Sequence, residues 1–305
     1  MFGFLRKHVA QAIAIALCLF LCQDIAAASK SWALVRVSVA NVREKPGHAS
    51  ELGSQVIMGT PLKITGREGD WLSIETPEGY KGYVIKNSVK LKSDEEMSVW
   101  RAADRVVVET YDQTYVYDHA VPSSESPRDT LAVHRLTDVV NGSVLERGKS
   151  APYGFSAVVL PDGRKGYIRS NEIKRFREWN GMDADIDEVI KFAICLNGTP
   201  YLWGGTSSKS MDCSGLTKIA FFSQGVILPR NASQQAKKGT DIPLHPMAGY
   251  KKGDLLFFGN PATGRVNHVG LYIGGNRFVH CAGRVMVSSL RQEDKDYIEL
   301  DLLYV

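Results

Sequence analysis

The sequence has few cysteines, little net charge and no long basic run. Its 5 cysteines among 305 residues are too few for a disulfide scaffold, and they are not spaced as paired C-x-x-C metal knuckles. A net charge of +4 without a dense Lys/Arg stretch predicts no nucleic-acid partner. Hydrophobic residues at 44% and charged residues at 23% exclude a disordered chain, a collagen-like fibre and a multi-span membrane protein. A chain of this length predicts two or three compact units.

An apolar run over residues 9–21 follows Arg6 and Lys7, and three alanines precede Ser29. A basic start, a short apolar stretch and small residues at the cut are typical of a signal peptide, which we predict over residues 1–28. The run is shorter than a typical membrane span, so we expect no integral span after cleavage. An uncleaved anchor is the alternative. Export would place the protein in the periplasm or in the medium.

Cleavage at this site leaves three cysteines, Cys195, Cys213 and Cys281. Exported proteins meet an oxidising compartment, and three cysteines cannot all pair within one chain. We therefore expect at least one reactive thiol. Helical spacing puts Cys195 on an apolar helix face, which predicts a core position.

A phrase near the end of one β-rich segment recurs in the next. Residues 77–84 read Pro-Glu-Gly-Tyr-Lys-Gly-Tyr-Val, and residues 161–168 read Pro-Asp-Gly-Arg-Lys-Gly-Tyr-Ile. Short alternating runs bounded by Gly, Pro and Asp/Asn turns surround both phrases. Two copies are too few for a solenoid, so we predict two small all-β barrels, over residues 29–93 and 94–176.

Residues 182–305 differ in composition and hold the reactive groups. One helical pattern starts near Ile186, with Asp183 or Asp185 as its N-cap. A second opens at Asp212-Cys213-Ser214-Gly215-Leu216. With Asp212 as N-cap, Cys213 lies in the first turn, where free N–H groups and the helix dipole favour a thiolate. We interpret Cys213 as a candidate nucleophile rather than a small buried side chain.

A nucleophilic cysteine needs a base, and a predicted hairpin supplies two histidines. Two apolar strands flank the turn Gly274-Gly275-Asn276 and place His268 and His280 on adjacent strands. His268 is the candidate base, and His280 the candidate that orients it. Strand alternation turns Cys281 to the face opposite His280. A zinc site made of Cys213 and both histidines is the competing interpretation, but it lacks a compact ligand pair, so we expect no metal or other cofactor.

Taken in order, these motifs resemble the NlpC-type cell-wall cysteine peptidases. The phrases that carry the resemblance are Tyr201-Leu202-Trp203-Gly204-Gly205, Asp212-Cys213-Ser214-Gly215-Leu216, Lys252-Gly253-Asp254-Leu255-Leu256-Phe257-Phe258 and Asn267-His268-Val269-Gly270. The β segments resemble bacterial SH3-like domains, through Asn41-Val42-Arg43 and the Gly-Tyr-x-Gly-Tyr ending. The resemblance implies an α+β fold class: a papain-like NlpC-type domain over residues 182–305, preceded by two SH3-like barrels, that cleaves peptidoglycan peptides.

The whole chain is similar to a subgroup, the γ-D-glutamyl-L-diamino acid dipeptidyl-peptidases. This implies hydrolysis of stem peptides with a free N-terminal L-Ala and release of L-Ala-D-Glu. It implies substrate-binding roles for Glu51, in Glu-Leu-x-x-Gln, and for Tyr80, in Gly-Tyr-x-Gly, both in the first barrel. The remaining substrate-binding candidates are Tyr201, Trp203, Asp212, Ser214 and Ser233.

Two alternatives stay open. One is an endopeptidase or amidase that acts on intact wall, and the other is a non-catalytic wall-binding protein. The sequence leaves the choice between Lys and diaminopimelate in the substrate open as well.

Overall fold

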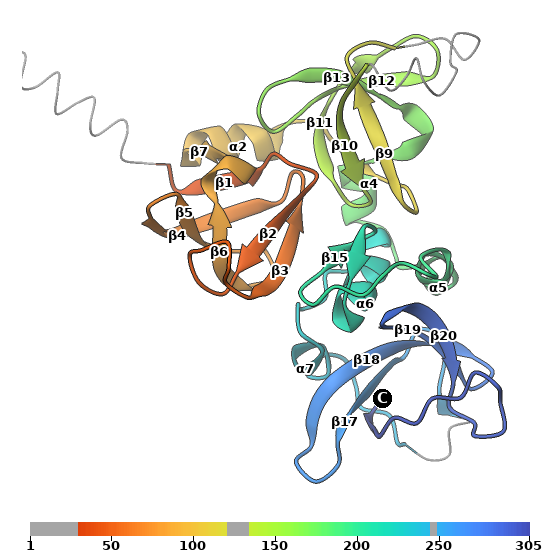
Figure 1. Cartoon of the computed structure of the whole chain (residues 1–305). Coiled ribbons are helices and arrows are strands. Elements are labelled where there is room, and N and C mark those ends of the chain that lie inside the picture. The colour runs from red at the N-terminus through yellow and green to blue at the C-terminus, as the bar shows by residue number, and fades with distance from the viewer. Residues whose placement is uncertain (1–29, 121–133, 245–248) are drawn as a thin grey trace, which may run out of the picture.

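The computed structural model describes residues 30–120, 134–244 and 249–305. The predicted signal peptide, residues 1–28, lies outside the described residues. Figure 1 shows two β-rich units placed above the helices α5 and α6, with a third sheet below them.

The first unit is a barrel-like antiparallel sheet with the strand order β3-β2-β6-β5-β4-β1-β7. Its strands are β1 (Trp32–Val35), β2 (Val39–Arg43), β3 (Leu52–Ile57), β4 (Pro61–Glu68), β5 (Trp71–Glu75), β6 (Lys81–Ile85) and β7 (Val89–Lys92). Side chains of alternating positions fill its core, as the sequence pattern predicts for strands buried on one face. Val42, Leu72, Ile74 and Val84 of this core are at most 2% exposed.

The second unit repeats the first, with the order β10-β9-β13-β12-β11-β8-β14. Its strands are β8 (Arg105–Val108), β9 (Gln113–Tyr117), β10 (Arg135–Val140), β11 (Val144–Ser150), β12 (Phe155–Val159), β13 (Lys165–Arg169) and β14 (Ile173–Arg175). Short 3-10 helices, η1 (Lys86–Ser88) and η3 (Ser170–Glu172), precede the last strand of each copy. Each strand therefore has its counterpart at the same place in the other copy, which confirms the predicted repeat.

A helix that we did not predict joins the two barrels. α2 (Asp94–Ala102) begins with a capping box, in which Ser93 accepts from the Glu96 N–H and Glu96 accepts from the Ser93 N–H. Met97 and Trp100 form its buried face. The Ser-x-x-Glu spacing is a helix-start signal that the β-rich surroundings hid.

The remaining residues form a helical layer on an antiparallel sheet with the order β20-β19-β18-β17-β21. The elements are α4 (Phe176–Asn180), α5 (Ile186–Cys195), β15 (Thr206–Ser207), β16 (Ser210–Met211), α6 (Cys213–Ser223), α7 (Ala232–Gln235), β17 (Leu255–Asn260), β18 (Arg265–Gly274), β19 (Arg277–Ala282), β20 (Arg284–Ser289) and β21 (Leu302–Tyr304). Buried side chains of α5 and α6 pack against those of β18 to β20. The predicted α+β class, with a Cys helix on an antiparallel sheet, is confirmed.

Asp185 caps α5 as predicted, accepting from the N–H groups of Asp187 and Glu188.

The predictions for Cys195 and Cys281 differ in outcome. The prediction that Cys195 is in the core is wrong, because the buried face of α5 runs through Val189 and its neighbours and turns Cys195 to solvent. The prediction for Cys281 is confirmed: it is 0% exposed and packs among side chains of the helical layer.

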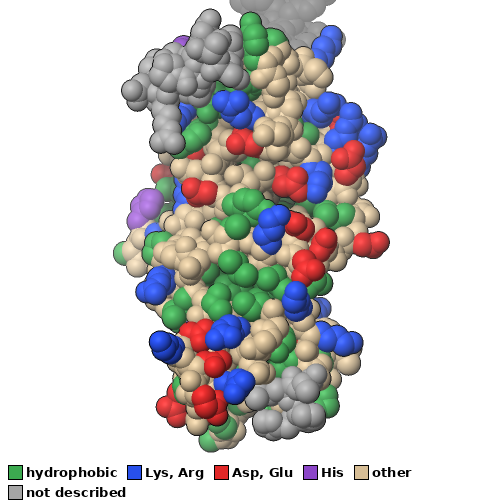
Figure 2. Space-filling view, turned by 90° about the vertical axis from the view of Figure 1, so that its right-hand side faces the viewer, with side chains coloured by type: hydrophobic (Ala, Val, Ile, Leu, Met, Phe, Trp, Pro, Cys, Tyr) green, Lys and Arg blue, Asp and Glu red, His purple; other side chains and the backbone are tan. Residues whose placement is uncertain are grey.

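The surface carries both signs of charge. On the face drawn in Figure 2, Lys and Arg side chains are interspersed with Asp and Glu side chains, and hydrophobic side chains gather near the middle. Among the described residues, no helix has both the length and the apolar character that crossing a membrane would require.

Candidate active site

Cys213 is the first residue of α6, and Asp212 is the N-cap of that helix. The Asp212 Oδ1 accepts from the Gly215 N–H at 2.7 Å, which satisfies one of the free donors of the first turn. Cys213 is 7% exposed. The N–H groups of Ser214 and Val269 face its sulfur. The predicted position of Cys213 at a capped helix start is confirmed.

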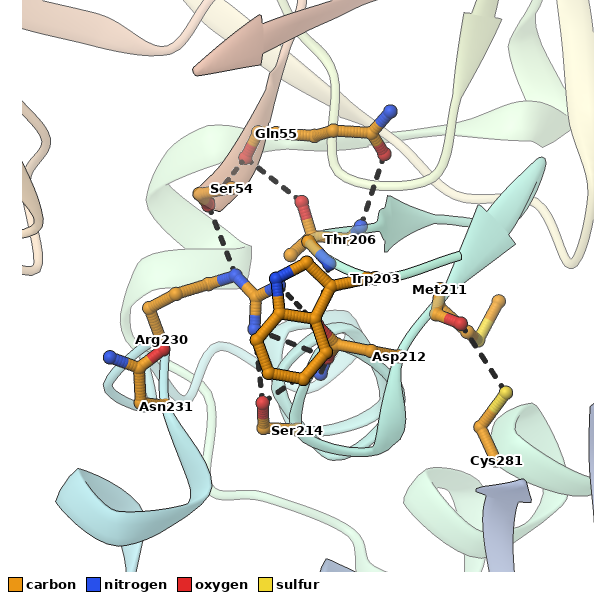
Figure 3. Close-up of polar contacts among 12 residues, drawn as sticks. Ser54, Gln55, Trp203, Thr206, Met211, Asp212, Ser214, Arg230, Asn231 and Cys281 are labelled. Carbon is orange, nitrogen blue, oxygen red and sulfur yellow. Dashed lines mark hydrogen bonds and ion pairs between the residues drawn. The ribbon is translucent and has the colours of Figure 1, made fainter. Parts of the chain in front are cut away.

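A buried arginine holds the Asp212 carboxylate (Figure 3). Arg230 Nη2 lies 2.5 Å from Asp212 Oδ2, and Nη1 lies 3.1 Å from Oδ1 and 3.0 Å from Ser214 Oγ. The Gly204 N–H donates to Oδ2 at 2.9 Å. Arg230 and Asp212 are 2% and 5% exposed. The carboxylate charge is therefore compensated inside the protein. The network fixes the start of α6 against residues 201–205, the Gly-rich loop.

The predicted hairpin brings the two histidines together. The Nε2 of His268, on β18, lies 2.8 Å from the Nδ1 of His280, on β19. Gly270 is directly opposite His280 in the ladder, and a Cβ on Gly270 would come within 2.5 Å of the Phe278 ring. The missing side chain on Gly270 thus leaves room for the Phe278 ring, which packs beside His280. Among the described residues, no hydrogen bond joins the Cys213 sulfur to His268, as is common where such bonds tighten on substrate binding.

Burial controls the protonation of this site. It raises the pKa of the Cys213 thiol to about 11, with the Asp212 charge acting in the same direction. Burial also lowers the pKa of His268 to about 4 and that of His280 to about 3. Desolvation therefore opposes the thiolate expected at the helix start and outweighs the N–H groups of the first turn. Both shifts favour the neutral thiol and the neutral imidazole over the ion pair.

The first barrel reaches this site through β3 and the turn before it. The Trp203 Nε1–H donates to Glu51 Oε1 at 2.9 Å, and Trp203 is 60% exposed, so it is not a core residue. Ser54 Oγ accepts from Arg230 Nε at 3.1 Å. The Thr206 N–H donates to Gln55 Oε1 at 3.1 Å, as Figure 3 also shows. Side chains of the first barrel thus contact the Gly-rich loop and the Asp212 network directly.

Tyr80 lies in an acidic corner of the first barrel. Its hydroxyl donates to Glu44 Oε1 at 2.5 Å. Burial, this hydrogen bond and the nearby Glu51 charge raise the pKa of Tyr80 well above its usual range. A Cβ on Gly53 would lie 2.1 Å from the Tyr80 oxygen, so only glycine at that position leaves space for the Tyr80–Glu44 pair. Glu51, Tyr80 and Glu44 are therefore grouped beside the loop that carries Trp203.

The other candidates have separate places. Tyr201 is half-buried, and burial raises its pKa to about 12, with the Cys213 and Asp212 charges adding to the effect. Ser214 belongs to the Arg230 network. Ser233 lies in the first turn of α7, exposed, after the N-cap Asn231.

Several residues of the site escaped sequence reasoning. Arg230 reaches it from a loop, Glu44 from just after the Asn41-Val42-Arg43 phrase, and Ser54 from an unspecified position of the Glu-Leu-x-x-Gln phrase. Gln235 is also buried here, donating to the Ser214 carbonyl and to the Pro229 carbonyl. Their partners are distant in the chain, so no local spacing could have revealed them.

The competing zinc interpretation does not fit the histidine geometry, since His268 Nε2 and His280 Nδ1 are directed at each other. Within the described residues, the donor group compact enough for a metal is Asp118, His119 and His134, in the second barrel.

Comparison with known proteins agrees with this architecture. The profile of the NlpC/P60 family matches residues 198–299, and that of the bacterial SH3 domain matches residues 38–90. Dipeptidyl-peptidase 6 of Lysinibacillus sphaericus is 30% identical over 87% of this chain and 94% of its own length. A gamma-D-glutamyl-L-lysine dipeptidyl-peptidase of Bacillus cereus is 27% identical over 76% of this chain and 68% of its own length.

A solved structure shares the fold. The crystal structure of an NlpC/P60 family protein from Bacillus cereus superposes with a TM-score of 0.75 at 23% identity, covering 89% of this chain and 98% of that one. Together with the Lysinibacillus sphaericus relative, which matches over nearly its whole length, the profile shows the family. The chain belongs to the NlpC/P60 family of peptidoglycan-hydrolysing cysteine peptidases.

Proposed function

We propose that this protein is a γ-D-glutamyl-L-diamino acid dipeptidyl-peptidase that takes stem peptides with a free N-terminal L-Ala and releases L-Ala-D-Glu. The observation that carries the proposal is the position of Glu51, which accepts from the Trp203 indole beside the Cys213 helix. Relatives that match most of this chain carry dipeptidyl-peptidase names. Export to the cell wall, through the leader predicted over residues 1–28, belongs to the same proposal.

Cys213 is the nucleophile of the proposed reaction. Since the resting thiol is neutral, attack on the γ-glutamyl carbonyl is coupled to transfer of the thiol proton to His268. Imidazolium His268 then protonates the departing α-amine of the diamino acid. Water activated by His268 releases L-Ala-D-Glu from the thioester. The first N–H groups of α6, with Tyr201 beside them, are the candidate donors to the tetrahedral oxyanion.

The substrate ammonium group is assigned to the acidic corner of the first barrel. Asp212 is compensated by Arg230, so its carboxylate fixes the helix start and leaves little charge for a ligand. Among the described residues neither Glu51 nor Glu44 forms a salt bridge, so both can supply negative charge, and the Tyr80 hydroxyl donates to Glu44. An anionic corner binds a free ammonium, and a blocked terminus would leave its negative charge unpaired on binding. Trp203 and Ser233 are proposed walls of the substrate groove.

The experiment is cleavage of L-Ala-γ-D-Glu-L-Lys and of its diaminopimelate analogue, each with a free and an acetylated N-terminus, analysed by mass spectrometry. We expect L-Ala-D-Glu from the free peptides only, and no product with Cys213→Ala. Glu51→Gln should lower kcat/KM for the free peptide about 30-fold or more, because the bound ammonium loses its charge partner.

Equal turnover of free and acetylated peptides would refute the dipeptidyl-peptidase assignment. Release of fragments from intact sacculus would then identify an endopeptidase or amidase. Membership in a family of cysteine peptidases already argues against a non-catalytic wall-binding protein.

A further inference from the structure

The His280 ring has a second hydrogen-bond partner that the proposed reaction does not use. Its Nε2 lies 3.0 Å from Ser288 Oγ, while its Nδ1 lies 2.8 Å from His268 Nε2. His280 and Ser288 are 0% and 1% exposed. Three polar groups on β18, β19 and β20 therefore form one row, which starts at the half-buried His268 and ends at a buried hydroxyl.

The sheet register and its packing place Ser288 there. Ser288 is directly opposite Phe278 in the β19–β20 ladder, so it shares a face with His280 two residues further along. The Phe278 ring centroid lies 4.8 Å from that of His280. In these apolar surroundings an N–H of His280 without an acceptor would be costly. Ser288 is the acceptor that the fold provides for Nε2.

The hydrogen bonds of this row can run in two directions, which differ in the nitrogen that carries the proton of each histidine. In the first, His280 Nε2–H donates to Ser288, His268 Nε2–H donates to His280 Nδ1, and His268 Nδ1 keeps a free lone pair. In the second, Ser288 donates to His280 Nε2, His280 Nδ1–H donates to His268 Nε2, and the proton of His268 is on Nδ1. Only the first direction leaves His268 able to take a proton from Cys213.

We propose that Ser288 is a positioning residue whose hydroxyl accepts the His280 Nε2–H and so holds His268 in the tautomer that can act as a base. This rests on the proposed function, in which His268 takes the Cys213 proton.

The need for an acceptor for His280 Nε2–H is stricter once His268 has become imidazolium. Both His268 nitrogens then carry protons, so Nε2–H must donate to His280 Nδ1, and His280 Nε2–H must donate onward. A Ser288 hydroxyl turns to accept without moving the backbone. Without it, the charged state leaves a buried N–H unpaired, and the penalty falls on the step that forms the imidazolium.

The test compares Ser288→Ala with the isosteric pair Ser288→Thr and Ser288→Val, which differ in a hydroxyl at nearly constant shape. We expect Ser288→Ala and Ser288→Val to lower kcat about 5- to 150-fold, the range that matches an unpaired buried donor. Ser288→Thr should restore most of the rate. Ser289→Ala is the matched control: Ser289 is equally buried, but its Oγ bonds Asp294, so kcat should stay near the wild-type value.

A second readout needs no substrate. Nitrogen-15 NMR of the imidazole rings of the full chain reports which nitrogen carries the proton. We expect the Nε2–H tautomer for His280 in the wild type and in Ser288→Thr, with a shift towards Nδ1–H in Ser288→Ala. An Nδ1–H tautomer in the wild type, or wild-type kcat in a folded Ser288→Val, would overturn the proposal. Failure of the proposed specificity would appear elsewhere, as turnover of acetylated peptides by the wild type.

Discussion

At the scale of single residues, the Arg230–Asp212 pair is the contact of the site that is most sensitive to the loss of one partner. Both side chains are buried, and they hold two charges together where water cannot compensate either one. Removing one partner of such a pair costs far more than the pair itself contributes, because a charge stays behind without a counterion. The residue that orders the helix start is therefore also a point of weakness.

We expect Arg230→Met to lower the free energy of unfolding by about 3–5 kcal/mol. Urea unfolding followed by tryptophan fluorescence measures the change. The double variant Arg230→Met/Asp212→Ser removes the stranded charge and keeps an N-cap, so it should recover part of the loss. A loss below about 1 kcal/mol in the single variant would show that the pair is not desolvated as described.

The buried histidines predict acid sensitivity. Burial lowers the pKa of His268 to about 4 and that of His280 to about 3, while an unfolded histidine titrates near 6.5. At pH values between the folded and the unfolded pKa, the histidines bind protons in the unfolded chain but not in the folded chain. The free energy of unfolding therefore falls as the pH decreases. The slope reaches about 1.4 kcal/mol per pH unit for each histidine. Urea unfolding at pH 7.5, 6.0 and 5.0 should show the decline, and His280→Gln should make it shallower; a flat wild-type profile would contradict the burial of both rings.

At the scale of elements, helices and strands with a strong local pattern were predictable from the sequence. The start of α6, its Asp212 cap and the β18–β19 hairpin follow from turn residues and periodicity. The exposure of Cys195 could not be predicted in this way, because Cys195 lies at the edge of the buried face of α5, where a small rotation of the helix decides whether a side chain is exposed. Arg230, Glu44 and Ser288 were also missed, since each acts through a partner brought near by tertiary packing.

The α6 start also depends on a glycine. Gly→Ala inside a helix usually stabilises by up to about 1 kcal/mol. A Cβ on Gly215, however, would lie 2.1 Å from the backbone oxygen of Gly205, which cannot move aside cheaply. We expect Gly215→Ala to cost about 1–3 kcal/mol of unfolding free energy and to lower the rate of peptide cleavage, because Cys213 shifts with the helix start. Gly249→Ala, which meets nothing within 4 Å, is the control, and equal behaviour of the two variants would disprove the close approach.

At the scale of the whole molecule, the two barrels hold one hairpin of the catalytic unit through equivalent strands. Gln55 on β3 bonds Thr206 of β15, and Asp138 on β10, the counterpart of β3, lies 2.5 Å from the ammonium of Lys209, in the turn before β16. The copies differ in what else they bring. The first carries Glu51 and Tyr80, whereas the second has Arg164, paired with Asp162, in place of Tyr80. The two copies thus share their docking to the catalytic unit, and under the proposed function only the first copy binds substrate.

This division predicts different consequences for matched substitutions in the two copies. Gln55→Ala removes the side-chain hydrogen bond that joins β3 to Thr206 of β15, and a bond of this kind contributes about 0.5–1.5 kcal/mol. We expect KM for the free tripeptide to rise about 2- to 10-fold with little change in kcat, because Glu51 and Tyr80 are held less firmly in position relative to Cys213. Asp138→Asn in the second copy should lower the melting temperature slightly and leave KM unchanged. If both variants raised KM equally, the second barrel would have to contribute to substrate binding as well.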